Sequence, residues 1–126
     1  MKRSIIGITI GDPAGAGPEI ALKALKSESL LKDSRIVLFG DETVVRRVMP
    51  IVKCEKELVV IKSVSEYEEG KINLISLNNM TDNYEFGKVQ SNCGKAAYEF
   101  IEAAIRQALA GNIDAVVTGP IKKEAL

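Results

Sequence analysis

A glycine-rich segment near the start of the chain joins a short apolar run to a helical pattern. The run from Ser4 to Ile10 is rich in isoleucine and ends at a turn, which predicts a strand buried on both faces. After the segment Gly11–Glu19, Pro18 being suited to a first helical turn, we expect a helix. Its apolar positions recur at helical spacing, at Ile20, Ala21, Ala24 and Leu25. The unit is therefore strand, tight loop and helix.

Strand-like and helix-like patterns alternate along the rest of the chain. Further strands are expected at Arg35–Gly40, Leu58–Ile61, Ile72–Leu77 and Ile113–Thr118. Asp41 is placed to cap a helix that must end near Pro50. The clearest helix runs from Gly94 to Leu109, with Gly111 placed to end it. This alternation predicts an α/β fold, a three-layer and largely parallel sheet with helices on both faces.

Three segments lie outside these predicted strands and helices. The polar stretch Ser63–Gly70 has room for one helical turn, and Asn78–Asn92 is expected to be a long surface loop. Pro120–Leu126 has the pattern of a helix that is just starting. Since a domain rarely stops at such a point, we expect residues 1–126 to be a portion of a larger protein.

Composition excludes several classes of protein. The 126 residues are 46% hydrophobic, with 17 basic and 17 acidic side chains, so no charged block favours nucleic acid. No apolar stretch is long enough to cross a bilayer. Cys54 and Cys93 form no CxxC pair, and we expect a cytoplasmic protein in which Cys93 packs rather than reacts. Histidine is absent, so a complete metal site here would depend on carboxylates.

The glycine-rich segment is a candidate ligand site because it lies between a strand and a helix N-terminus. Its spacing differs from the GxGxxG fingerprint, and no Lys-Ser/Thr pair follows to make a phosphate loop. We take Gly11, Asp12, Gly15 and Gly17 as candidate cofactor-binding residues. The alternatives are that the glycines only permit a tight connection and that Asp12 caps turn amides. Glu19 is expected to interact with the helix dipole.

A second candidate site follows the last strand. Thr118 and Gly119 lie at a carboxyl strand end, where open α/β sheets bind ligands, and are candidate substrate-binding residues. Alternatively, Gly119 and Pro120 only end the strand. Lys122 and Lys123 could attract a phosphate, although lysines in a first helical turn are usually solvated.

Four segments carry a resemblance to a known family. Ile8–Ile20 closely resembles the opening signature of 4-hydroxythreonine-4-phosphate dehydrogenases of the vitamin B6 pathway, where Ile is more frequent at the position of Ala16. It is also similar to the turn that opens isocitrate and isopropylmalate dehydrogenases. Gly87–Val89, Gly94–Tyr98 and Asp114–Ile121 resemble the same family in the same order. Lys122 stands where the family usually carries Asn.

The resemblance implies an incomplete isopropylmalate dehydrogenase-like domain, the amino-terminal α/β portion of a two-domain enzyme. It implies NAD-dependent oxidation of 4-phosphohydroxy-L-threonine with subsequent decarboxylation, in pyridoxal 5'-phosphate biosynthesis, assisted by a divalent metal such as Zn, Mg or Co. It also implies a homodimer. The family's metal-binding histidines lie downstream, so we expect this chain to hold no catalytic residue or metal ligand and to be inactive alone.

Three alternatives remain open at this stage. A related dehydrogenase of phosphorylated threonate or erythronate would share every motif. A non-catalytic ligand-binding or assembly module could keep the turn as a platform. An acyl- or phosphotransferase could present a similar Thr-Gly-Pro edge.

Overall fold

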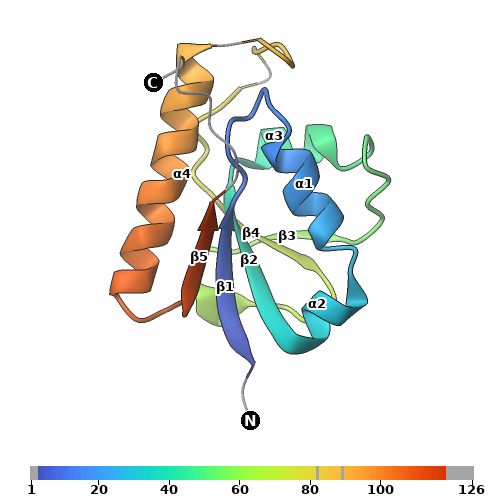
Figure 1. The fold of residues 1–126 in the computed structure, drawn as a ribbon, viewed down its shortest axis with the longest axis vertical. Coiled ribbons are helices and arrows are strands. Elements are labelled where there is room, and N and C mark those ends of the chain that lie inside the picture. Colours follow the sequence, from blue (N-terminus) through green and yellow to red (C-terminus); the bar gives the residue numbers. More distant parts are fainter. Residues whose placement is uncertain (1–2, 82, 89, 119–126) are drawn as a thin grey trace.

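The computed structural model describes residues 3–81, 83–88 and 90–118, which form a five-stranded parallel sheet flanked by helices (Figure 1). The strand order is β3-β4-β2-β1-β5. In chain order the elements are β1 (Ser4–Thr9), α1 (Gly17–Ala24), α2 (Glu28–Asp33), β2 (Ser34–Gly40), α3 (Glu42–Val48), β3 (Leu58–Val60), the 3-10 helix η1 (Val64–Glu66), β4 (Ile72–Ser76), α4 (Ser91–Leu109) and β5 (Ala115–Thr118).

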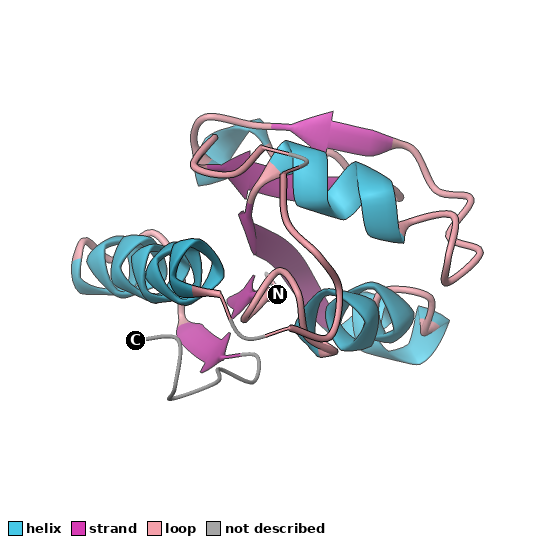
Figure 2. Ribbon diagram, turned by 90° about the horizontal axis from the view of Figure 1, so that it is seen from above, coloured by secondary structure: helices cyan, strands magenta, loops and turns pink. Residues whose placement is uncertain are grey.

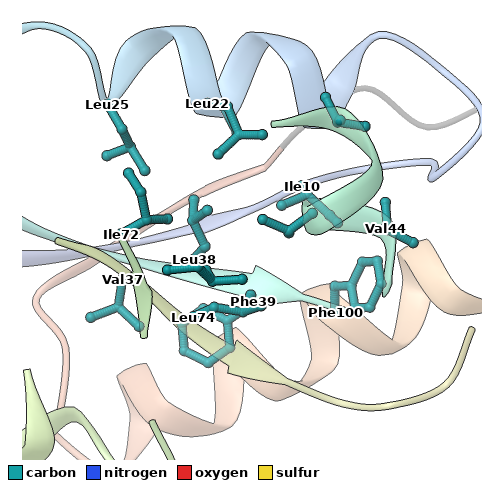
Figure 3. Close-up of a cluster of buried hydrophobic side chains, with 14 of the residues drawn as sticks. Ile10, Leu22, Leu25, Val37, Leu38, Phe39, Val44, Ile72, Leu74 and Phe100 are labelled. Carbon is teal, nitrogen blue, oxygen red and sulfur yellow. The ribbon is translucent and has the colours of Figure 1, made fainter. Parts of the chain in front are cut away.

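Helices lie on both sides of the strands, as the view from above shows (Figure 2). In the core, Leu22 and Leu25 of α1 point at the sheet from one side, while Phe100 of α4 lies on the other (Figure 3). The central strand β2 carries Leu38 and Phe39, both fully buried. An unbroken apolar run is what a strand covered on both faces requires. The predicted three-layer α/β fold is confirmed.

The ends of the helices follow from local capping, with two differences from the predictions. Asp41 caps α3 as expected, its Oδ1 accepting the Val44 N–H at 3.2 Å. Helix α4 begins three residues earlier than predicted, at Ser91, because the fully buried Cys93 anchors its first turn. The short helix α2 was not predicted, since six residues are too few for a helical period to show. Its cap, the Ser27 hydroxyl accepting from the Leu30 N–H, was the available signal.

Two predicted apolar faces are partly wrong. In α1, Ile20 is 56% exposed while Leu22 is fully buried, so the helix is rotated relative to the predicted stripe. In α4, Ile105 and Leu109 are 46% and 84% exposed although both belong to the predicted stripe. This end of α4 lies beside the edge strand β5, where the described sheet offers less surface to cover a side chain.

The segment Asn78–Asn92 is more than a surface loop, which corrects the prediction. Met80 and Tyr84 are 8% and 5% exposed and belong to the buried core. Asp41, besides capping α3, accepts the Met80 N–H on Oδ2 at 3.0 Å, which fastens the loop to the start of α3. The helix expected at Pro120–Leu126 lies outside the described residues. Within the described part, no helix is long and apolar enough to span a membrane.

Candidate functional site

The two candidate ligand segments lie at one point of the sheet. From β1 the chain moves through α1 and α2 to β2 on one side, whereas from β4 it moves through α4 to β5 on the other side of β1. Ligands in open α/β sheets bind outside the carboxyl strand ends where the strand order reverses in this way. The register pairs Thr9 with Thr118, so the glycine-rich turn and Thr118 leave the sheet side by side. Gly119 lies outside the described residues.

The turn folds back closely on the end of β1. Gly11 has a φ of +75°, a conformation that L side chains rarely adopt. A Cβ at Gly17 would lie 2.2 Å from the Ile10 carbonyl oxygen, so only glycine fits there. A Cβ at Gly15, in contrast, would meet nothing closer than the Asp12 carbonyl oxygen at 3.6 Å. The need for a tight connection explains why glycine stands at positions 11 and 17. It does not explain Gly15, because the described residues leave space for a side chain there.

Asp12 is buried in the turn, with 1% of its surface exposed. Its Oδ1 accepts the Ala14 N–H at 2.8 Å and its carbonyl oxygen accepts the Gly15 N–H at 2.9 Å, so the predicted capping role is confirmed. Its Oδ2 is buried and has no hydrogen-bond partner within the described structure. Because an unpaired buried carboxylate oxygen is costly, this atom is suited to accept a donor that the chain itself does not supply.

A small apolar cavity opens beside the turn, between α1 and β5. Its volume is about 150 Å³, and its walls include Ala21 and Ala24 of α1. Ile20 and Val117 also line it and are 56% and 52% exposed. Thr9 and Thr118, which are paired in register, also line it. Pockets that enclose small-molecule ligands are commonly larger, roughly 300 to 1,000 Å³, so this cavity is at most one wall of a cofactor site.

The described residues lack the ligand set that a divalent metal ion requires. Among the described residues, no group of three or more His, Cys, Asp or Glu side chains is placed to hold a metal ion. The turn offers one buried carboxylate, Asp12, and its Oδ1 already accepts a backbone N–H. The described residues therefore do not fit a divalent metal site by themselves.

Sequence reasoning missed an aromatic segment that contacts the turn. We call residues 83–88 the strap. The guanidinium carbon of Arg47 lies 4.5 Å from the Tyr84 ring centroid and 4.0 Å from that of Phe86. The Gly87 N–H donates to the Ala14 carbonyl oxygen at 2.8 Å. Two aromatic residues in an otherwise polar loop were the signal for this contact, since such side chains usually pack.

Burial affects the pKa of Tyr84 in the strap. It raises the pKa of Tyr84 above its ordinary value of 10.0, the neighbouring carboxylate Asp41 adding to the rise while the Arg47 cation opposes it. The Tyr84 hydroxyl oxygen is buried without a hydrogen-bond partner in the described part of the chain. Tyr84 is therefore a neutral packing residue at physiological pH.

These features define an open parallel α/β domain with a small cavity at the point where its strand order reverses. The family model for "Pyridoxal phosphate biosynthetic protein PdxA" matches residues 32–126. The chain belongs to this family.

Relatives and solved structures agree with the assignment. A Fusobacterium nucleatum protein named "Putative D-threonate 4-phosphate dehydrogenase" is 40% identical over 127 residues, and a Clostridium botulinum protein of the same name is 41% identical over 128. The alignments cover 98% and 99% of this chain and 38% of each relative. The 4-hydroxythreonine-4-phosphate dehydrogenase structure from Burkholderia phymatum superposes with a TM-score of 0.93 at 38% identity, covering 99% of this chain and 38% of that one. The chain thus spans less than two-fifths of the proteins it matches.

Proposed function

We propose that residues 1–126 are the amino-terminal α/β portion of a two-domain, NAD- and divalent metal-dependent dehydrogenase. The observation that carries the proposal is the pairing of Thr9 with Thr118, which brings the glycine-rich turn and the end of β5 to one crevice in a chain of this family. A non-catalytic module or a group transferase has no comparable support, because the relatives and neighbours named above are dehydrogenases.

The proposed substrate is a small hydroxy acid phosphorylated at carbon 4. The first candidate is 4-phosphohydroxy-L-threonine, oxidised and then decarboxylated on the way to pyridoxal 5'-phosphate, in line with the names of the family and of the solved structures. The second is D-threonate 4-phosphate, favoured by the name of the relatives at 40% and 41% identity. The two substrates differ at carbon 2, which carries an ammonium group in one and a hydroxyl in the other.

The residues of the crevice receive distinct roles in this proposal. Gly11 and Gly17 shape the turn, and Gly15 lets the cofactor approach its backbone closely. Asp12 accepts a hydroxyl of the cofactor on its unpaired Oδ2. Thr118 and Gly119 contact the substrate. The nicotinamide would take the hydride, and a metal such as Zn, Mg or Co, held by ligands outside this chain, would polarise the alcohol.

Assembly and location complete the proposal. The full-length protein is proposed to be a cytoplasmic homodimer. It is proposed to bind a small phosphorylated substrate and neither nucleic acid nor a membrane. The exposed apolar pair Ile20 and Val117 is consistent with coverage by further protein in the complete enzyme.

The test uses the full-length protein from the complete reading frame. Purified enzyme is incubated with NAD, a divalent metal and each candidate substrate in turn, and NADH formation is followed by absorbance. We expect turnover with one of the two substrates, loss of activity with a chelator and recovery when metal is restored. Absence of NADH with both substrates across Zn, Mg and Co would refute the proposal. Residues 1–126 alone should show no turnover.

A further inference from the structure

One arginine connects helix α3 to the strap. Arg47 places its guanidinium against the rings of both Tyr84 and Phe86 and donates from Nη1 to the Tyr84 carbonyl oxygen at 3.1 Å. The two rings meet edge to face at 87°, with their centroids 5.8 Å apart. Stacking of a guanidinium on aromatic faces is attractive, and the planar group adds a directed hydrogen bond. Arg47 therefore fixes the strap at its aromatic end.

Gln90, directly before α4, holds the strap at two places, at Glu85 between the two aromatic residues and at Lys88 at its end. The Gln90 Oε1 accepts the Glu85 N–H at 3.0 Å, and its Nε2 donates to the carbonyl oxygens of Glu85 at 2.7 Å and Lys88 at 3.1 Å. The strap is thus held from α3 and from the start of α4. Besides the Tyr84 ring, which is buried in the core, the strap is attached to the glycine-rich turn, and both segments lie at the carboxyl end of the sheet (Figure 1).

The contact with the turn is made at one peptide segment. The Ala14 carbonyl oxygen accepts the Gly87 N–H at 2.8 Å, and the Ala14 N–H donates to Asp12 Oδ1 at 2.8 Å. Ala14 is held from both sides, once by the strap and once by the turn's own carboxylate. The next residue, Gly15, donates its N–H to the Asp12 carbonyl oxygen at 2.9 Å. Loss of the Gly87 hydrogen bond would remove one of the two hydrogen bonds that hold Ala14, the residue directly before Gly15.

We propose that Arg47 is a positioning residue: through the strap it holds the glycine-rich turn in one conformation. The consequence for ligand binding rests on the proposed function, whereas the mechanical connection does not. A turn that is already ordered loses less conformational entropy when a ligand binds. Loss of the Arg47 contacts should therefore weaken NAD binding without any contact between Arg47 and NAD.

The first arm of the test measures the mechanical connection in the full-length protein. Amide hydrogen exchange is compared between wild type, Arg47→Met and Arg47→Lys, with Arg46→Met as the matched control. Arg46 is the neighbouring residue of α3, 57% exposed and paired with Glu42 at 2.7 Å rather than with the strap. We expect exchange at Gly87, Ala14 and Gly15 to accelerate roughly tenfold in Arg47→Met, the factor for loss of one charge-assisted contact.

The pattern of exchange decides this arm. Arg47→Lys should be intermediate, because it keeps the charge but has no planar group to stack between two rings. Arg46→Met should leave the three amides unchanged. Unchanged exchange in Arg47→Met would overturn the inference. Acceleration spread equally over β2 and α4 would also overturn it, because that pattern reports a general loss of stability.

The second arm measures NAD affinity by calorimetry and the kinetic constants of the same variants. We expect the Kd and KM for NAD to rise roughly fivefold in Arg47→Met with kcat within about twofold, since positioning of a binding turn affects binding and not the chemical step. Faster exchange with unchanged NAD affinity in an active enzyme would overturn the role in binding. If wild type neither binds nor reduces NAD, the proposed function fails, and the exchange pattern alone decides whether Arg47 holds the turn.

Discussion

Gly17→Ala should destabilise the protein because the turn has no space for a methyl group. The added Cβ would lie 2.2 Å from the Ile10 carbonyl oxygen and 3.1 Å from the Ile10 carbonyl carbon. Both are backbone atoms at the end of β1, so no side-chain rotation relieves the overlap. Overpacking of this kind costs about 1 to 3 kcal/mol, while exchange of glycine for alanine in a helix gains at most about 1 kcal/mol. We expect a net loss of roughly 1 to 2 kcal/mol.

Gly15→Ala is the matched control for this prediction. Its Cβ would meet the Asp12 carbonyl oxygen at 3.6 Å, an ordinary contact. The substitution should leave stability unchanged or raise it by up to about 1 kcal/mol, since alanine restricts the unfolded chain. Urea unfolding of the full-length variants, followed by circular dichroism, compares the midpoints of the transition that includes this domain. A Gly17→Ala midpoint equal to that of Gly15→Ala would refute the steric argument.

Three further substitutions test other contacts. Tyr84→Phe removes a buried hydroxyl without a partner and should be neutral or stabilising by about 1 kcal/mol. Because burial raises the pKa of Tyr84 above 10.0, the wild type should lose stability as the pH rises above that value. Urea unfolding midpoints measured across alkaline pH should show a smaller loss of stability in the variant. Asp41→Ala removes the acceptor of both the Val44 and Met80 N–H groups and should cost about 2 to 4 kcal/mol in urea unfolding, with retention of the wild-type midpoint as the contrary result. Asp12→Asn keeps a side-chain acceptor for the Ala14 N–H but changes the unpaired oxygen, so calorimetry should show NAD binding weakened about tenfold with little change in unfolding, and equal affinity would exclude Asp12 from the cofactor site.

The sequence predicted those features that depend on neighbouring residues. The unbroken apolar run of β2, the long stripe of α4 and the cap at Asp41 are local patterns, and each was found near its expected position. Helix α2 is too short to show a period, and the phase of α1 depends on the sheet beneath it. This is why Leu22 rather than Ile20 is buried. A helical stripe predicts a buried face only when the width of the surface that covers it is known.

The candidate site divides in the same way. The turn from Gly11 to Gly17 could be recognised from its residues, because glycine and proline mark a tight connection directly. The pairing of Thr9 with Thr118 depends on strand order, and the strap depends on Arg47 meeting Tyr84 and Phe86 some 40 positions away. A single sequence carries no signal for such distant pairs beyond the residue types themselves.

A charge placed at Gly15 tests whether the glycine-rich turn binds the dinucleotide. Gly15→Asp and Gly15→Asn differ by one unit of charge at nearly equal size, so both should perturb the turn alike. The measurement is the dissociation constant of NAD for the two full-length variants by calorimetry at low ionic strength. Because NAD carries a negatively charged pyrophosphate, NAD held against the turn predicts binding at least about tenfold weaker for Gly15→Asp than for Gly15→Asn. Equal dissociation constants, with wild-type affinity in both, would contradict binding of the dinucleotide at the turn.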